Sequence, residues 1–346
     1  MRNMVRALVF VVLSAVMVLE LGCGGSRTAG PSTAGEGGAG KPPHVSSGQF
    51  VVFESDRLDP GTSLTWGLWL YDTRLGQLVD LPGLNVPAGS YYWMYSSISR
   101  DGRYITFQSD RAGGEGNTDI CLYDRDAGSL VPLPNLNSSA WDSGPSRVED
   151  DRYIAFSSNR PGWRTATDIY LYDRRTATVM DLPGLNSSDP TKKEQWPSIS
   201  SGANYITFCA YSRPDGPGGW DVFLYDRRNA RLIDLPGVNS SRDEWHPTIT
   251  ADGRYIAFSG TTGPDGEGIC LYDSRRSSFV RLPNLNTNTG ETAPCISGDG
   301  RYIAFQANRP YYSAGTNVYV YDRKTARTTD WPGLNSTGFD GSASIN

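Results

Sequence analysis

The sequence predicts an all-β protein, a six-bladed β-propeller of four-stranded antiparallel blades whose ring is closed by the C-terminal strand. A pentapeptide close to Leu-Pro-Gly-Leu-Asn occurs six times, beginning at Leu81, Leu133, Leu182, Leu235, Leu282 and Trp331. Each repeat also contains four short runs of β-type residues separated by turn signals. Four strands in a repeat of roughly 50 residues are typical of one propeller blade.

We name the four strands of a blade a to d, with d at the outer edge. Strand b reads Arg-Tyr-Ile-Ala-Phe at 152–156, 254–258 and 301–305. Both faces of this run are apolar, as expected for a blade packed between two others, and Ile and Phe point to one side while Tyr and Ala point to the other. Strand b of the six blades is marked by Phe53, Phe107, Phe156, Phe208, Phe258 and Phe305.

Turn residues punctuate the strands. Strands a and b are joined by Asp-Gly at 101–102, 252–253 and 299–300, a strong hairpin signal. Strand c ends in Tyr-Asp in all six repeats, and this Asp can accept local backbone N–H groups at the c–d turn. We interpret the pentapeptide as structural: its Pro blunts the exposed edge of strand d, and Pro-Gly then turns the chain back towards the axis.

The first blade lacks a strand a of its own, because the domain opens on strand b at Gln49. The C-terminal segment Ser342–Asn346 matches Ser96–Arg100, which precedes the second strand b. We therefore expect the last residues of the chain to supply the missing strand and to close the ring.

The N-terminal region differs from the repeats. Residues 1–22 combine Arg2 and Arg6 with a short apolar run, as in a signal peptide, and end before Cys23 in a pattern that resembles a bacterial lipobox. Glu20 departs from that pattern, where an aliphatic residue is usual. Residues 23–48 are a Gly/Ser/Pro-rich segment, expected to be a flexible tether, and the propeller is expected at 49–346. We expect a protein of the cell envelope, lipid-anchored on the periplasmic or outer-membrane side.

The repeat resembles that of the TolB propeller family, in which blades read roughly SPDGKxIAFxSDRxGxxxIYxxD. The closest copy runs from Ser99 to Asp124, and the resemblance covers residues 49–346. It implies the propeller fold. The N-terminal α/β domain and the docking tether of TolB are not recognised in this sequence, so the resemblance does not imply a role in the Tol–Pal system.

Composition excludes some functions. A net charge of −5 without a basic stripe argues against nucleic-acid binding. The chain contains only two histidines, His44 and His246, so we expect no zinc or other metal site, although Ca²⁺ could bind acids. Cysteines 121, 209, 270 and 295 lie in apolar strand patterns, which favours buried thiols but leaves disulfides open. We expect a monomer without a cofactor.

Candidate site residues occur in the longer connections, b–c and d–a, which lie on one face that we call the top face. Three residues before the Pro of strand a, or its equivalent, five repeats carry an acid: Asp142, Glu194, Glu244, Glu291 and Asp340. The sixth has Trp93. Aromatic residues and the one domain histidine stand beside these acids: Trp141, Trp196, Trp245 and His246. Either the acids form a ring that binds a cation, peptide or sugar, or they cap backbone N–H groups while each Trp packs between blades.

These features predict a non-catalytic binding or scaffolding module of the envelope, with a protein, peptide, cation or glycan bound at the channel mouth. The alternative is a carbohydrate-active enzyme, a glycosidase in which two of Glu194, Glu244 and Glu291 converge. We expect no catalytic residue for other hydrolases, because no Ser/His/Asp set can be assembled around a single histidine.

Overall fold

The structure is a computed structural model that describes residues 46–57, 67–84, 93–110, 118–146, 152–160, 166–189, 192–213, 216–309 and 315–346, with the backbone alone at 93 and 94. The expected signal peptide, Cys23 and the expected tether as far as residue 45 lie outside these residues, so those predictions remain predictions. Within the described ranges, no helix is both long enough and apolar enough to span a membrane.

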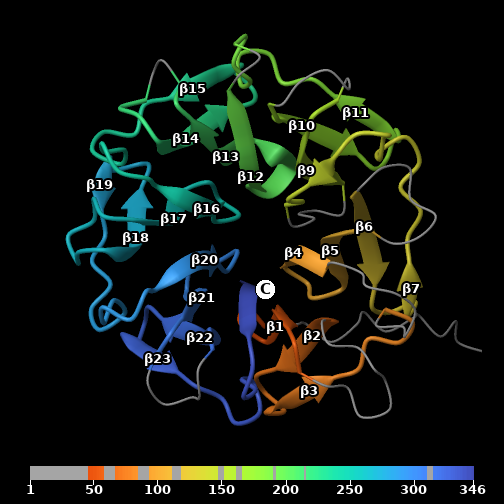
Figure 1. Cartoon of the computed structure of the whole chain (residues 1–346), viewed down its shortest axis with the longest axis vertical. Helices are drawn as coiled ribbons and strands as arrows, with labels where there is room; N and C mark the ends of the chain where they lie inside the picture. The colour runs from red at the N-terminus through yellow and green to blue at the C-terminus, as the bar shows by residue number, and fades with distance from the viewer. Residues whose placement is uncertain are drawn as a thin grey trace, which may run out of the picture. The chain divides into compact units, whose positions relative to one another are not determined.

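The described residues form six four-stranded antiparallel sheets arranged as blades around a common centre (Figure 1). The strands a, nearest the centre, are β24 (Asp340–Ile345), β4 (Trp93–Ile98), β8 (Asp142–Ser143), β12 (Lys193–Ile199), β16 (Trp245–Ile249) and β20 (Thr292–Ile296). The strands b are β1 (Phe50–Ser55), β5 (Tyr104–Ser109), β9 (Tyr153–Ser158), β13 (Tyr205–Tyr211), β17 (Tyr255–Gly260) and β21 (Tyr302–Ala307).

The outer half of each blade consists of strands c and d. The strands c are β2 (Gly67–Asp72), β6 (Asp119–Asp124), β10 (Asp168–Asp173), β14 (Trp220–Asp226), β18 (Gly268–Asp273) and β22 (Asn317–Asp322). The strands d are β3 (Gln77–Val79), β7 (Ser129–Leu130), β11 (Thr178–Met180), β15 (Arg231–Ile233), β19 (Ser278–Phe279) and β23 (Arg327–Thr329). A short 3₁₀ turn, η1 (Ser201–Ala203), joins β12 to β13.

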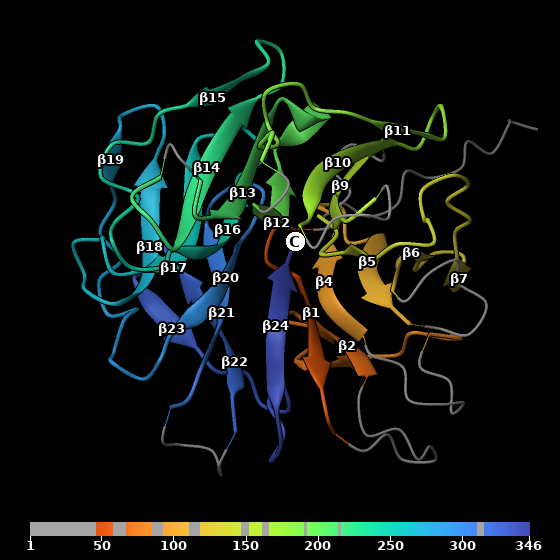
Figure 2. The same ribbon diagram turned by 45° about the horizontal axis from the view of Figure 1, so that its top comes forward.

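The C-terminal strand closes the ring, as the sequence predicts. β24 pairs antiparallel with β1, with Ile345 opposite Val51 and Asp340 opposite Ser55 (Figure 2). The amide of Asn346 adds to this closure, because its Oδ1 accepts the Phe50 N–H at 2.7 Å.

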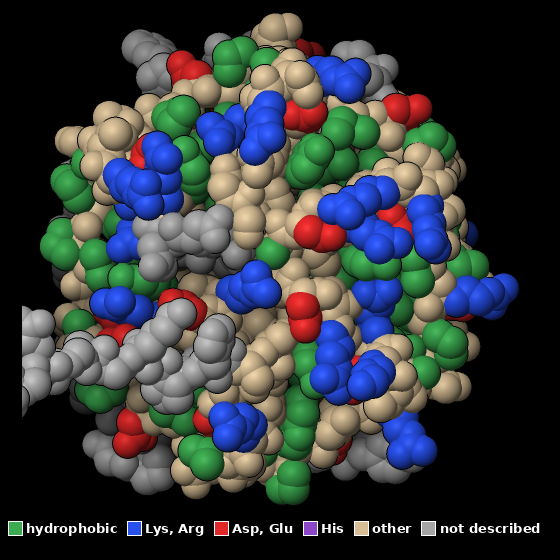
Figure 3. Space-filling view, turned by 180° about the vertical axis from the view of Figure 1, so that it is seen from behind, with side chains coloured by type: hydrophobic (Ala, Val, Ile, Leu, Met, Phe, Trp, Pro, Cys, Tyr) green, Lys and Arg blue, Asp and Glu red, His purple; other side chains and the backbone are tan. Residues whose placement is uncertain are grey.

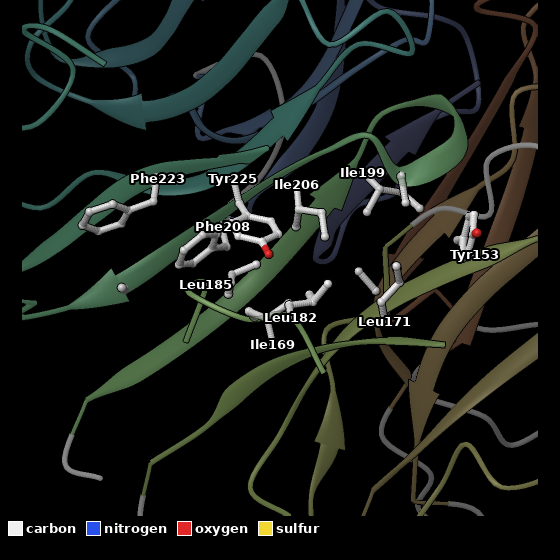
Figure 4. Close-up of a cluster of buried hydrophobic side chains, with 13 residues drawn as sticks. Tyr153, Ile169, Leu171, Leu182, Leu185, Ile199, Ile206, Phe208, Phe223 and Tyr225 are labelled. Atoms are coloured by element: carbon white, nitrogen blue, oxygen red, sulfur yellow. The ribbon is translucent and has the colours of Figure 1, made fainter. Parts of the chain in front are cut away.

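Six apolar clusters hold the ring together, one between each pair of neighbouring blades. In the cluster of Figure 4, Tyr153 and Ala155 of β9 face Ile206 and Phe208 of β13 in the next blade. This large-against-small arrangement confirms the predicted orientation of strand b. All six strand-b phenylalanines have no exposed surface, so each contributes on the order of 2–3 kcal/mol of burial free energy.

The prediction that the pentapeptide Pro lies on strand d is wrong. In the first blade β3 ends at Val79, and Pro82 lies in the turn that follows. Its carbonyl oxygen instead accepts a hydrogen bond of 2.8 Å from the hydroxyl of Tyr123 in strand c of the next blade. Equivalent bonds join Tyr71–Pro332, Tyr172–Pro134, Tyr225–Pro183 and Tyr321–Pro283. The pentapeptide therefore fastens neighbouring blades to each other at five of the six interfaces, and the hydroxyl of Tyr272 at the sixth lacks such a bond.

The Asn that ends the pentapeptide has a second structural role. The Oδ1 of Asn186 accepts the Ile169 N–H at 2.8 Å, and its Nδ2 donates to the Ile169 carbonyl at 2.9 Å. The side-chain amide thus completes the hydrogen bonding of strand c beyond the short strand d. The same pairs of bonds are formed by Asn137, Asn239, Asn286 and Asn335.

The a–b and c–d turns lie together on the face opposite the top face, which we call the turn face. Figure 3 shows many Lys and Arg side chains there beside a smaller number of acids. Several are paired within the fold: Arg103 with Asp124 at 2.7 Å, and Arg254 with Asp273 at 2.7 Å. The Asp of each Tyr-Asp pair also accepts backbone N–H groups of its turn, as Asp72 does from Arg74, so this predicted turn role is confirmed.

Candidate functional site

The five acids of the top face are buried. Asp142, Glu194, Glu244 and Asp340 are 0% exposed and Glu291 is 3% exposed. In each blade a carboxylate oxygen accepts the backbone N–H of a Ser or Thr in the d–a connection just before it. These donors are Ser138, Ser187, Ser240, Thr287 and Ser336. The carboxylates therefore cap the connection that leads into strand a.

Four of the five acids also meet an arginine from the end of strand b. The pairs are Arg57–Asp340, Arg160–Asp142, Arg213–Glu194 and Arg309–Glu291, with N–O distances from 2.5 to 3.3 Å. In the fifth blade Thr262 occupies the arginine position and donates to the Val238 carbonyl at 2.8 Å. This geometry fits the capping alternative, because the charges face their own loops and partners rather than an open channel mouth.

The burial of these acids affects their protonation. Burial raises the pKa of Glu194 to about 7, against the opposing effects of the Ser187 N–H and Arg213. Burial also raises the pKa of Glu244. It would raise the pKa of Glu291 too, but hydrogen bonds from Thr287 and Thr289 outweigh it and hold that pKa below its usual value.

A second ring of residues, two positions after the acids, lines the centre of the propeller. Its members are Tyr95, Gly144, Trp196, His246, Ala293 and Ser342, one from each blade. All six have a positive φ, between 47° and 56°. In five blades the pairing of strands a and b also shifts register near this position, which marks a β-bulge. We call these six residues the bulge ring.

The bulge ring surrounds a central cavity of about 270 Å³. Below the ring the wall continues with prolines and hydroxyl side chains of strand a, such as Pro197 and Ser198. The Ser198 hydroxyl accepts the Ile249 N–H of the next blade at 3.2 Å, so the wall is also hydrogen-bonded around the ring. Neither Lys, Arg, Asp nor Glu is among the described residues that line this cavity.

Aromatic rings occupy one side of the cavity. Trp196 is at the centre of this group, with ring centroids 4.8 Å from His246, 5.0 Å from Trp220 and 6.4 Å from Tyr95. Trp245 stacks on Trp196 at 6.4 Å with an interplanar angle of 18°. The first, third and sixth blades carry the small residues Ser342, Gly144 and Ala293 at the equivalent positions.

His246 is a neutral ring in this setting. Burial lowers its pKa from 6.5 to about 4. Its Nδ1 has no hydrogen-bond partner among the described residues, although it is shielded from solvent. Although His246 belongs to the cavity wall, its Nδ1 is therefore not on the accessible surface of that wall.

The N–H groups exposed by the bulges are satisfied by the preceding blade. The Gln108 Oε1 accepts the Gly144 N–H at 2.9 Å, and the Gln306 Oε1 accepts the Ser342 N–H at 3.0 Å. In the first blade the equivalent residue is Glu54, which is 3% exposed. Burial raises the pKa of Glu54 to about 8, although N–H groups of the next strand a and the Ser342 side chain bond to it.

The sequence singled out only part of this site. Trp196 and His246 belong to the bulge ring, and Trp245 lies beside them with 37% of its surface exposed. Trp141 is 54% exposed but lines neither the central cavity nor the groove beside it. The backbone of Trp93 belongs to β4, and its side chain lies outside what the structure describes. Tyr95, Ala293, Ser342 and Gly144 were not selected as a set, because six different residue types hide their common position.

Within the described part of the chain, no three His, Cys, Asp or Glu side chains gather in a way that could hold a metal ion. The four described cysteines are free thiols, so no disulfide joins them.

Comparisons with known proteins place the fold. No family model matches the sequence, and no curated protein matches it. TolB from Acinetobacter baumannii is similar in structure, with a TM-score of 0.62 and 15% identity over 86% of this chain and 66% of that chain. A TolB-type protein from Agrobacterium tumefaciens gives a TM-score of 0.55 and 13% identity, over 86% of this chain and 96% of that chain.

A third similar structure is hydrazine synthase from Kuenenia stuttgartiensis, with a TM-score of 0.58 and 13% identity over 86% of this chain and 46% of that one. The chain spans slightly less than two thirds of the Acinetobacter protein. At such identities the similarity shows the fold alone. The chain has a six-bladed propeller of the TolB type, and the resemblance expected from its repeats is confirmed at that level.

Proposed function

We propose that this protein is a non-catalytic binding module of the cell envelope, anchored through lipid at Cys23, whose ligand enters the central cavity from the top face. The observation that supports this proposal most is the asymmetry of the bulge ring. Six equivalent positions surround the cavity. The second, fourth and fifth blades place the large rings of Tyr95, Trp196 and His246 there, whereas the other three blades place small residues.

The fold alone does not require these side chains. A left-handed backbone conformation costs a non-glycine residue on the order of 1–2 kcal/mol, and Gly144 occupies the same position at no such cost. Strained residues that persist in a fold are found preferentially at functional sites. Large aromatic residues in three blades and small residues in the other three leave space for a ligand, whereas six large side chains would fill the channel.

The geometry of the acids favours binding over catalysis. A glycosidase needs two carboxyl groups about 5–9 Å apart that both reach the sugar. Glu194 and Glu244 are fully buried, accept hydrogen bonds from their own connections, and do not line the central cavity. Glu291 lines a groove beside the cavity, but it is 3% exposed and its carboxylate is held by the Thr287 N–H and by Arg309. We therefore keep the carboxylate-pair enzyme as the less favoured reading.

The proposal can be tested by blocking the cavity. Ala293→Trp places a large ring at a bulge position that already has φ 49°, close to the 54° of Trp196. The control is Leu75→Trp, because Leu75 is 65% exposed in a c–d turn of the turn face. Thermal shifts would be measured with Ca²⁺, oligolysine, neutral oligosaccharides and aromatic peptides.

We expect at least one ligand class to raise the Tm of the parent and of Leu75→Trp, and to lose that effect in Ala293→Trp. A ligand that stabilises Ala293→Trp as much as the parent binds elsewhere, and this result would exclude the cavity. No shift with any class would contradict a binding role at this site.

A further inference from the structure

We propose that the ligand is a neutral linear glycan, which places its terminal sugar in the central cavity and its following units in a groove between the fifth and sixth blades. This inference rests on the proposed function, because it names the ligand class of the same cavity. It adds a second subsite that the acid ring and the bulge ring do not by themselves reveal.

The groove adjoins the central cavity. It has a volume of about 560 Å³, and His246 and Gln306 line both hollows. A ligand that leaves the cavity past these two side chains therefore enters the groove. The cavity itself is slightly smaller than the roughly 300–1,000 Å³ of typical ligand pockets, so it accommodates one unit of a longer chain.

The aromatic residues form consecutive platforms along this path. Trp196 lines the cavity, and Trp245, which stacks on it with an interplanar angle of 18°, lines the groove. Trp245 is 37% exposed, so part of its ring is available to a ligand in the groove. Flat aromatic faces next to polar groups suit the C–H faces and hydroxyls of sugar rings, since one end of the surface is apolar and the other is wet.

The polar groups of the groove match hydroxyls. Asp243, Glu267 and Asn288 line it, and each offers an oxygen that can accept a hydroxyl proton. His246 itself stands at the junction of the two hollows, because it lines both.

The charges select among glycans. Lys and Arg are absent from the described residues that line either hollow, while Asp243, Glu267 and Glu291 line the groove. Glu267 lies 4.0 Å from Arg242 and Glu291 is paired with Arg309, so Asp243 contributes most of the uncompensated negative charge. An anionic chain such as a polyuronate would be repelled by these carboxylates. A basic peptide would be attracted, but the cavity that must hold its end carries no described carboxylate. A neutral glycan is compatible with the charge of both the cavity and the groove.

The test compares glycan length in the whole chain by tryptophan fluorescence titration. The probes are N-acetylglucosamine and its tetramer, glucose and cellotetraose, tetragalacturonate as the anionic chain and tetralysine as the basic peptide. We expect a neutral tetramer to bind at least tenfold more tightly than its monomer, and tetragalacturonate to bind no better than a monomer.

Variants assign the subsites. Trp245→Ala should reduce the affinity for the tetramer at least tenfold, and should reduce that for the monomer far less. Trp141→Ala is the matched control, since Trp141 is more exposed, at 54%, but lines neither hollow. Ala293→Trp should remove both affinities.

Each outcome decides one of the two proposals. Equal affinity for monomer and tetramer, or an unaltered tetramer affinity in Trp245→Ala, would overturn the groove subsite and leave the cavity. Tight binding of tetralysine or tetragalacturonate in preference to the neutral chains would overturn the glycan while leaving a cavity ligand. If Ala293→Trp binds the monomer and the tetramer as tightly as the parent does, the proposed function itself is overturned.

Discussion

Replacing Glu54 by Gln should make the protein more stable at alkaline pH. Glu54 occupies the strand-b position at which Gln108 and Gln306 accept the N–H of a bulge residue. Its carboxyl group is buried, and one oxygen, Oε1, has no hydrogen-bond partner among the described residues. A neutral amide can therefore take over the acceptor role that the fold requires, as it does in two other blades.

The magnitude follows from the two pKa values of Glu54. Its pKa rises from 4.5 to about 8 on burial, so the folded protein keeps a proton that the unfolded chain loses between these pH values. The stabilising effect of the protonated carboxyl is complete below pH 4.5 and is lost as the pH rises towards 8. At 1.36 kcal/mol per unit, this loss is on the order of 5 kcal/mol.

The assay is urea unfolding between pH 5 and pH 9, read by tryptophan fluorescence. We expect Glu54→Gln to match the parent near pH 5 and to exceed it by several kcal/mol at pH 9. Gln108→Glu is the reciprocal variant, since it introduces a buried carboxyl at the equivalent position, and it should steepen the loss of stability with pH. An unchanged pH dependence in Glu54→Gln would refute the reasoning.

Three further predictions test the repeat and the anchor. Tyr123→Phe removes the interblade bond to the Pro82 carbonyl and should lower the free energy of unfolding by about 1–2 kcal/mol. Tyr272→Phe is the control, because the Tyr272 hydroxyl lacks a partner among the described residues, and it should change the free energy of unfolding little in the same denaturation assay. Asp142→Asn leaves Arg160, whose side chain is 18% exposed, without its carboxylate and should cost about 3 kcal/mol. A similar loss in Glu244→Gln, where no described ion pair is broken, would contradict this account. Cys23→Ser should move the protein out of the membrane fraction, and its retention there at parent levels, with the signal removed, would reject lipidation.

The strand framework was predictable from sequence because it depends on features that recur in every blade. The alternation of Tyr and Ala against Ile and Phe in strand b follows from period-2 geometry and burial on both faces. The C-terminal strand was found in the same way, because Ser342–Asn346 repeats a pattern seen elsewhere in the chain. In contrast, the role of Pro82 was predicted incorrectly, because its partner Tyr123 lies 41 residues away and in another blade.

The arginine partners of the acids were missed for a related reason. Asp340 and Arg57 are 283 residues apart in the chain, and only ring closure brings them within 2.7 Å. The Arg was visible in the repeat, at the end of the Ser-Asp-Arg run after strand b. The a–b hairpin already places the end of strand b beside the start of strand a, but the residue pattern does not indicate that the two side chains turn towards each other and pair.

The bulge ring illustrates how repetition and function can be separated in a protein built from repeats. A residue that supports the blade is needed in every blade, and so the acids, Tyr-Asp pairs and pentapeptides recur with little change. A ligand at the axis is a single object that meets all six blades at once, and it has no six-fold symmetry of its own. Positions that contact it are therefore free to differ, provided that the backbone conformation is kept. The combination found here, one repeated left-handed bulge and six different side chains, is what the proposed site for one asymmetric ligand would require. It also explains why position, rather than residue type, identifies the proposed site in this chain.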